Sequence, residues 1–164
     1  MIDFPKLTLI TAAAVMISFS GNAQNNEPLT FFAIGDWGRE GKMMQSETAD
    51  AMNKAAETRK PDFIISTGDN FYPTGVKSKQ DKQWETSFEK IYTGEHIDLP
   101  WYVVLGNHDH LGRPCAQVKY SKSSEKWNMP SPYYTFTRKA QSKTVRFIFI
   151  DTDPYVRPKR MHRM

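Results

Sequence analysis

The chain has 164 residues, a length that suits a single domain with its own hydrophobic core. Hydrophobic residues make up 39% and charged residues 24%, and these ordinary fractions exclude intrinsic disorder as the default state. The formal net charge is +4, but residues 154–164 hold four Lys and Arg and no Asp or Glu, so the rest of the chain is neutral overall. We interpret residues 154–164 as a solvated basic tail. Because no basic patch with interleaved aromatic residues accompanies it, we expect no nucleic-acid partner.

The first residues are typical of a signal peptide. Lys6 precedes an apolar run over residues 7–19, and the small residues Gly21 and Ala23 flank a cleavage point after Ala23. The run is shorter than the roughly 20 residues that span a bilayer, so we expect no stable membrane insertion once the signal is removed. A buried core helix is the alternative, but the cleavage site favours export. Residues 1–23 are therefore interpreted as a signal peptide and the protein as secreted or periplasmic.

The remaining sequence alternates between expected strands and helices. Short apolar runs predict five strands, at residues 30–34, 63–66, 101–105, 133–137 and 145–150. Apolar residues at helical spacing predict three helices, at residues 43–60, 78–91 and 116–123. Residues 122–132 are rich in Ser, Lys and Pro and are expected to form a surface loop. The strand–helix–strand order indicates βαβ units and a largely parallel sheet.

Three polar clusters follow the first three expected strands. They read GDWG from Gly35, GDNFY from Gly68 and GNHDH from Gly106. Gly-Asp and Gly-Asn are common turn dipeptides, so any one cluster alone is typical of a turn. Ligands of open α/β sheets, however, bind outside the carboxyl ends of the strands. Because each of the three successive clusters pairs a glycine with an oxygen-bearing side chain, together they indicate a metal site.

These motifs, in this order and spacing, resemble the metallophosphoesterase superfamily and, within it, the purple acid phosphatases of the tartrate-resistant type. The resemblance runs from about Phe31 to Asp153 and includes PWYVVLGNHDHLG and KWNMPSPYY. It implies an α/β fold of layered sheets with flanking helices, an α/β/β/α sandwich. Residues 24–153 would be the N-terminal part of this calcineurin-like domain. It also implies an exported acid phosphatase that hydrolyses phosphate monoesters.

The resemblance further implies a dinuclear centre of a ferric ion and a divalent iron, zinc or manganese ion. Asp36 and Tyr72 would bind the ferric ion, Asp69 would bridge the two metals, and Asn107 would bind the divalent ion. His108 would hold the phosphate or protonate the leaving group. Carboxylate and phenolate oxygens suit a ferric ion, and a shared carboxylate suits two metals about 3.5–4 Å apart. The tyrosine points to the purple enzymes, since most dinuclear metallophosphoesterases have no tyrosine ligand.

Asp109 and His110 follow His108 and are candidates for supporting the centre. Asp109 either orients the imidazole of His108 or is a solvated turn carboxylate, and the sequence leaves both open. His110 is more typical of a surface or hydrogen-bonded histidine than of a ligand. Trp37 is expected to pack rather than to line a cleft.

The family pattern has three further histidine ligands in later segments that this chain lacks. His162, in the basic tail, has neither the glycine nor the second histidine of that pattern, so we do not expect it to replace them. The chain is therefore interpreted as an N-terminal portion that ends after about the fifth strand, with apolar faces near Phe147 and Phe149 exposed. An inactive truncated fragment is one alternative. A phosphodiesterase or nuclease on the same scaffold is another alternative. Two features count against it, namely Tyr72 and the neutral charge of the rest of the chain.

Overall fold

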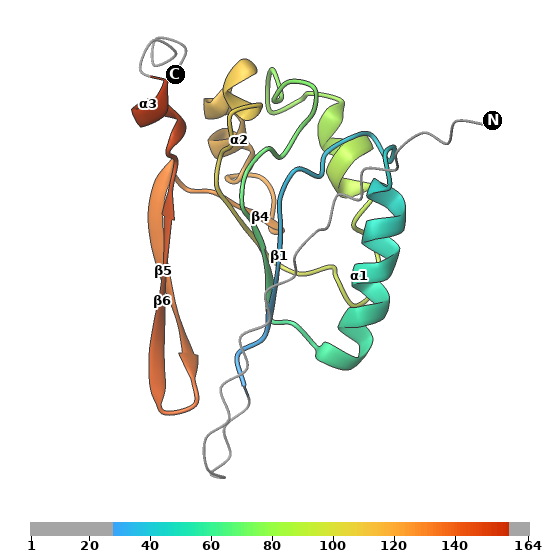
Figure 1. Ribbon diagram of the computed structural model, residues 1–164, viewed down its shortest axis with the longest axis vertical. Coiled ribbons are helices and arrows are strands. Elements are labelled where there is room, and N and C mark those ends of the chain that lie inside the picture. Colours follow the sequence, from blue (N-terminus) through green and yellow to red (C-terminus); the bar gives the residue numbers. More distant parts are fainter. Residues whose placement is uncertain (1–27, 158–164) are drawn as a thin grey trace, which may run out of the picture.

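The computed structural model describes residues 28–157, so the expected signal peptide and His162 lie outside the described residues (Figure 1). The strands are β1 (Phe31–Ile34), β2 (Phe63–Ser66), β3 (Trp101–Val103), β4 (Trp127–Asn128), β5 (Tyr133–Ala140) and β6 (Lys143–Ile150). The α-helices are α1 (Gln45–Arg59), α2 (Pro114–Tyr120) and α3 (Asp153–Val156). A π-helix, η1 (Trp84–Glu89), and a 3-10 turn, η2 (Asp109–Leu111), complete the elements. No helix within residues 28–157 is long and apolar enough to cross a membrane.

The first four strands form one parallel sheet in the order β1-β2-β3-β4. Phe31 pairs with Phe63, and Ile64 pairs with Trp101. Strands with covered faces are typical of parallel sheets, and α1 covers one face through Ala49 and other small buried residues. The expected βαβ organisation is therefore confirmed, and all four strands end at the same edge of the sheet.

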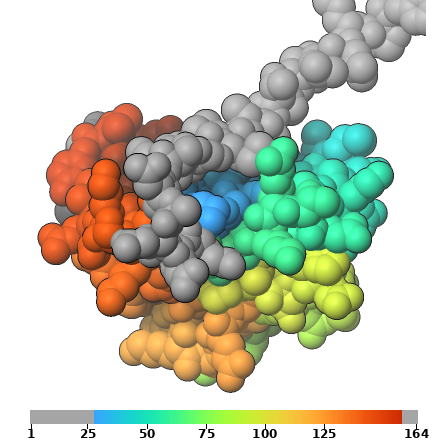
Figure 2. All heavy atoms as spheres, turned by 90° about the horizontal axis from the view of Figure 1, so that it is seen from below, coloured from blue at the N-terminus to red at the C-terminus, as the bar shows by residue number. Residues whose placement is uncertain are grey.

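Strands β5 and β6 form a separate antiparallel hairpin rather than an extension of the parallel sheet. One face of this hairpin packs on the parallel sheet through aromatic rings. Phe136 stacks on Tyr102 with ring centroids 3.7 Å apart and meets Phe63 edge-on at 5.5 Å. Figure 1 shows the hairpin and α1 on opposite sides of the parallel sheet, and Figure 2 shows β1 between them from below. The predicted layered fold is confirmed, and the described residues supply three layers of it.

The hairpin exposes an apolar face, as expected from the sequence, and this face carries the neighbours of Phe147 and Phe149. Side chains alternate between the two faces of a strand. Phe149 is only 6% exposed because it faces the parallel sheet, where its ring stacks on that of Tyr134. Ile148 and Ile150 point the other way and are 65% and 52% exposed. The expectation of an apolar exposed surface therefore holds for the neighbours of Phe147 and Phe149, and not for the phenylalanines themselves.

An aromatic core lies between the parallel sheet and the helices. Trp37 is 4% exposed and packs against Trp101 and Phe88, with ring centroids 5.3 and 5.8 Å apart. The expectation that Trp37 packs rather than lines a cleft is therefore correct. Trp127 and Met129 are fully buried here, although residues 122–132 were expected to form a surface loop. Strand β4 has only two residues, too few for a periodic pattern to reveal it.

The helix expected over residues 78–91 is shorter than predicted. Asp81 accepts a hydrogen bond from the Gln83 N–H at 3.0 Å, and only residues Trp84–Glu89 form a helix, of the π type. The Lys90 N–H donates to the Glu85 carbonyl five residues earlier, which places both Trp84 and Phe88 in the core. The two rings lie four residues apart, the spacing from which the helix was predicted, and both are buried.

Tyr134 fastens the hairpin to the edge of the parallel sheet. Its hydroxyl accepts a hydrogen bond from the Val103 N–H at 2.7 Å and lies 2.9 Å from the Val103 carbonyl and 3.0 Å from that of Asn128. A buried N–H without a partner costs about 1–3 kcal/mol.

We therefore expect Tyr134→Phe to lower the free energy of unfolding by about 1–3 kcal/mol, because the Val103 N–H loses its acceptor while the ring remains. Urea denaturation measures the change. Tyr155→Phe is the matched control, since Tyr155 is 75% exposed, and it should change stability by less than about 0.5 kcal/mol. Equal effects of the two substitutions would contradict this role of the hydroxyl.

Candidate metal centre

Two aspartates begin the strand-end loops in the left-handed backbone conformation. Asp36 follows β1 with φ 62°, and Asp69 follows β2 with φ 51°. Asp tolerates this conformation better than most residues. The Asp36 N–H donates to the Gly68 carbonyl at 3.1 Å, which joins the two loops. These sharp turns bring both carboxylates to the same edge of the sheet.

The loop after β3 approaches the loop after β2 so closely that only glycine fits between them. A Cβ atom on Gly106 would lie 2.2 Å from both the N and the Oδ1 of Asp69. Gly68, on the other loop, has φ 110°, a conformation that side chains rarely adopt. The His108 N–H also donates to Asp69 Oδ1 at 2.8 Å. The second and third clusters are therefore in direct contact, as their places at neighbouring strand ends predict.

Tyr72 brings a third oxygen atom to the two carboxylates. Its hydroxyl oxygen lies 2.6 Å from Asp36 Oδ1 and 2.9 Å from Asp69 Oδ2. A phenol carries one proton, so it can donate to only one of the two carboxylates at a time. Partial burial and the hydrogen bonds to both aspartates raise the pKa of Tyr72. A cation placed among these oxygens would reverse that effect, because it favours the ionised form of each.

Cationic and aromatic groups hold the Tyr72 ring. The guanidinium carbon of Arg39 lies 3.6 Å from the ring centroid, within the range of a cation–π interaction. The His108 ring centroid is 4.3 Å away, with the two planes inclined by 40°. The position of the phenol oxygen is therefore fixed by contacts to the ring as well as by its own hydrogen bonds.

The hydrogen bonds of His108 determine its tautomer. Its Nδ1 lies 2.7 Å from the Pro73 carbonyl oxygen, which can only accept. Nδ1 must therefore carry a hydrogen, and Nε2 is the nitrogen that remains for a ligand or a proton. The side chain is half-buried. This geometry suits proton transfer at Nε2.

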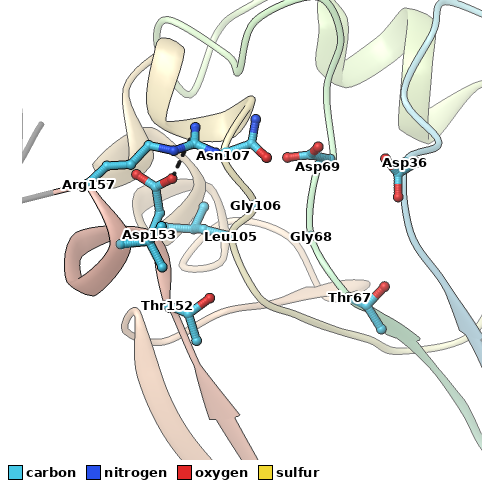
Figure 3. Close-up of a pocket in the computed structure, with 11 residues that line it drawn as sticks. Asp36, Thr67, Gly68, Asp69, Leu105, Gly106, Asn107, Thr152, Asp153 and Arg157 are labelled. Atoms are coloured by element: carbon cyan, nitrogen blue, oxygen red, sulfur yellow. Dashed lines mark ion pairs between the residues drawn. The ribbon is translucent and has the colours of Figure 1, made fainter.

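A pocket of about 260 Å³ lies at this edge of the sheet. Asp36, Asp69 and Asn107 line it together, and Figure 3 shows their side chains along the strand-end loops. Asp153 and Arg157 line the other side and pair with each other at 3.5 Å. Three of the four predicted ligands thus share one pocket, and the fourth, Tyr72, contacts two of them.

Sequence reasoning missed two residues, Asp153 at the start of α3 and Arg157 directly after it. Arg157 was counted within the solvated basic tail, whereas it lines the pocket beside Asp153. Their spacing, an acid four residues before a base, is a signal for an ion pair on a helix, but α3 has only four residues and no periodic pattern of its own.

Asp109 takes neither of the roles expected for it. It is completely buried, so it is not a solvated turn carboxylate, and it accepts hydrogen bonds from the Gly106 N–H at 2.9 Å and the Asn70 N–H at 3.0 Å. The His108 ring instead bonds to the Pro73 carbonyl. Burial raises the pKa of Asp109 to about 6, against the opposite effect of these N–H groups.

His110 is a buried, hydrogen-bonded histidine, one of the two forms expected. Its Nε2 lies 2.8 Å from Asp151 Oδ2, and its Nδ1 lies 4.0 Å from Asp153 Oδ2. Burial alone would lower the pKa of His110, but the hydrogen bond to Asp151 and the charges of both aspartates raise it overall. It connects the loop after β3 to the segment after β6 and does not line the pocket.

The donor atoms fit a hard metal ion better than a soft one. Within residues 28–157, no three His, Cys, Asp or Glu side chains gather closely enough to hold a metal. The cluster instead combines two carboxylates with a phenol and an amide, all of which offer oxygen. Oxygen donors suit ferric iron, manganese and magnesium.

Comparisons with known proteins identify the family of the chain. Residues 29–160 match the calcineurin-like phosphoesterase family. Tartrate-resistant acid phosphatase type 5 from Mus musculus is 41% identical over 132 residues, which cover 76% of this chain and 40% of that protein. Purple acid phosphatase 7 from Arabidopsis thaliana is 41% identical over 131 residues, 78% of this chain and 38% of that protein. Among solved structures, GAP50, the anchor in the inner membrane complex of Plasmodium, superposes with a TM-score of 0.66 at 31% identity, covering 76% of this chain and 42% of that one.

The chain belongs to the calcineurin-like phosphoesterase family, whose members act on phosphate esters. Its curated relatives include tartrate-resistant and purple acid phosphatases, which confirms the resemblance predicted from the motifs. The chain spans about 40% of the length of these relatives.

The contact between Gly106 and Asp69 generates a testable prediction. We expect Gly106→Ala to destabilise the fold by about 1–3 kcal/mol, because its Cβ would meet a backbone atom that cannot move away. Gly35→Ala is the matched control, since the one close contact of its Cβ would be with the side-chain hydroxyl of Thr67, while the nearest backbone atom, the Gly68 carbonyl oxygen, is at an ordinary contact distance of 3.6 Å. Thermal unfolding compares the two variants, and a control as unstable as Gly106→Ala would contradict the prediction.

Proposed function

We propose that the protein hydrolyses phosphate monoesters with two metal ions bound at the candidate metal centre. The observation that carries the proposal is the convergence of the Tyr72 hydroxyl on Asp36 and Asp69, at 2.6 and 2.9 Å. Oxygen atoms held this close around a single proton form a favourable environment for a cation. The names of the curated relatives support the acid phosphatase activity.

In this proposal Asp36 and Tyr72 bind a ferric ion, Asp69 bridges the two ions, and Asn107 binds a divalent iron, zinc or manganese ion. When bound, the metal pair lowers the pKa of a water molecule and offsets charge on the phosphoryl oxygens. Asp69 is suited to bridging because Oδ1 accepts the His108 N–H and Oδ2 faces Tyr72, which fixes the carboxylate plane.

The residues around the metals bind the substrate and move a proton. His108 keeps one hydrogen on Nδ1, held by the Pro73 carbonyl, so in its imidazolium form the second hydrogen, on Nε2, is the one given to the leaving-group oxygen, which leaves a neutral imidazole. Arg157 is the one Lys, Arg or His among the described residues that line the pocket, and we assign it to the phosphate. Asp153 holds it in place through their ion pair.

We also propose that residues 1–23 direct export and are removed, so that the enzyme acts outside the cytoplasm, as the polar segment after residue 23 supports. Residues 24–153 would then form the catalytic part and residues 154–164 a basic extension that starts within α3.

An assay with p-nitrophenyl phosphate at acid pH tests the activity directly. The protein is loaded with iron and zinc and compared with Asp69→Asn, which keeps the shape of the side chain but removes the bridging charge. We expect a loss of about a thousandfold in kcat/KM, since the metals supply several kcal/mol of transition-state stabilisation. Equal turnover by the variant would contradict the proposal. Metal binding without any turnover would instead favour a non-catalytic role, such as the anchoring named for GAP50.

Tyr72→Phe tests the ferric site separately from turnover. The ring and its contacts with Arg39 and His108 remain, and only the phenol oxygen is lost. The iron-loaded protein should show visible charge-transfer absorption that disappears in the variant. Tyr102→Phe is the control, because the Tyr102 ring stacks on Phe136 of the hairpin and is not part of the candidate metal centre. This variant should keep the absorption. An unchanged spectrum in Tyr72→Phe would exclude Tyr72 as the iron ligand.

Arg157→Gln tests the assignment of the phosphate-binding residue. We expect KM for the substrate and the inhibition constant of inorganic phosphate to rise by about tenfold each, because a charge-assisted hydrogen bond is worth about 1.5–3 kcal/mol. Arg59→Gln, at the far end of α1, is the control and should leave both constants unchanged. A rise in neither constant for Arg157→Gln would remove Arg157 from the substrate site.

A further inference from the structure

We infer that Asp109 is a positioning residue, whose buried carboxylate sets the spacing between the loops that carry Asp69 and Asn107. The inference rests on the proposed function for its purpose, because these loops hold the proposed ligands. This role replaces the two that the sequence suggested for Asp109. Asp109 does not line the pocket, so it acts through its neighbours and not on the substrate.

The carboxylate of Asp109 accepts hydrogen bonds from three different segments. Oδ2 accepts the Asn70 N–H at 3.0 Å and the Gly106 N–H at 2.9 Å, and it lies 3.3 Å from the side-chain nitrogen of Asn70. Oδ1 accepts the Gln117 side-chain amide at 2.7 Å. Asn70 directly follows Asp69, and Gly106 directly precedes Asn107. One side chain thus holds the backbones on both sides of the proposed metal pair.

Asn70 extends this network to the first loop. Its side-chain amide donates to the Val104 carbonyl at 2.9 Å and to Gln117 Oε1 at 3.0 Å, and its Oδ1 accepts the Ser66 hydroxyl. Ser66 Oγ in turn accepts the indole N–H of Trp37 at 2.8 Å. Because Trp37 directly follows Asp36, all three strand-end loops are linked through hydrogen bonds beneath the pocket.

The network lies in a dry part of the core. Ser66, Asn70, Asp109 and Gln117 are each 0% exposed, so water cannot replace a lost partner. Hydrogen bonds in such surroundings are stronger than in water, and an unmatched donor is correspondingly costly. Every group around Asp109 is a donor, so an ionised carboxylate satisfies all of them, whereas an amide would turn its own NH₂ toward one of them.

The backbone N–H of His108 reports the spacing between the loops, and the Asp109 carboxylate makes no hydrogen bond to it. This N–H donates to Asp69 Oδ1 at 2.8 Å, across the gap between the second and third loops. If Asp109 sets that gap, its loss should open this hydrogen bond more than it weakens the fold as a whole.

Amide hydrogen exchange, measured by NMR on the metal-free protein and on Asp109→Asn, tests the inference. Exchange at His108 should quicken at least tenfold more than exchange at amides within β2 and β3, which report the stability of the sheet. Ile97→Val is the control, because Ile97 is buried before β3, at the opposite end of the strand from the site. It should change exchange at His108 and in the strands by the same factor.

The double variant Asp109→Asn with Gln117→Glu is designed as a rescue. It exchanges the carboxylate and the amide between the two hydrogen-bonded positions 109 and 117. The amide introduced at position 109 would donate to the carboxylate introduced at position 117, and the Asn70 and Gly106 groups would keep an acceptor. We expect the double variant to restore exchange at His108 to within about threefold of the original protein. If the single variant fails to fold, the double variant alone decides the test. Faster exchange at His108 in the double variant, or a failure of the double variant to fold, would overturn the inference.

Exchange in Asp109→Asn that rises equally at His108 and in the strands would also overturn it, since Asp109 would then be merely structural. None of these measurements needs a metal or turnover, so a protein without phosphatase activity would refute the proposed function and leave this test intact. Where activity is present, Asp109→Asn should lower kcat by more than tenfold with KM nearly unchanged, and the double variant should recover it.

Discussion

The site depends on a close approach of two backbones at the ends of neighbouring parallel strands. Gly106 lies against Asp69 so closely that no side chain fits between them, and the His108 N–H bonds to the Asp69 carboxylate across the same gap. Parallel pairing of β2 with β3 brings the loops to one edge, but only the absence of a Cβ lets them meet. The ligand geometry therefore follows from backbone packing before any side chain is considered.

That packing forces like charges together. Asp36 and Asp69 share the single proton of Tyr72, and the packing of its ring prevents the phenol from turning away. A folded protein tolerates such a cluster only if surrounding contacts hold it, and here Arg39 and His108 flank the ring while the core fixes the loops. The region where these oxygen atoms are held together is thus favourable to a cation.

Much of this arrangement can be predicted from the sequence, and the parts that cannot be predicted have physical causes. The strands β1 to β3 and the strand-end positions of Asp36 and Asp69 follow from local patterns, because apolar runs and glycine turns act over a few residues, whereas the role expected for Tyr72 came from the family resemblance. Strand β4 and the π-helix depend on tertiary contacts of Trp127 and Trp84, which no periodicity records. The sequence could not show that Asp109 is buried either, because its partner Asn70 lies 39 residues earlier in the chain.

The second sheet is coupled to the site through buried charge. His110 follows the ligand loop after β3, and its imidazole pairs with Asp151 at the end of β6, with both side chains almost completely buried. Asp153, two residues on, holds Arg157 at the pocket. Because breaking a buried pair leaves an uncompensated charge, the hairpin cannot shift on the parallel sheet without disturbing His110. The aromatic packing between the sheets therefore determines where the guanidinium of Arg157 stands relative to the carboxylates opposite it.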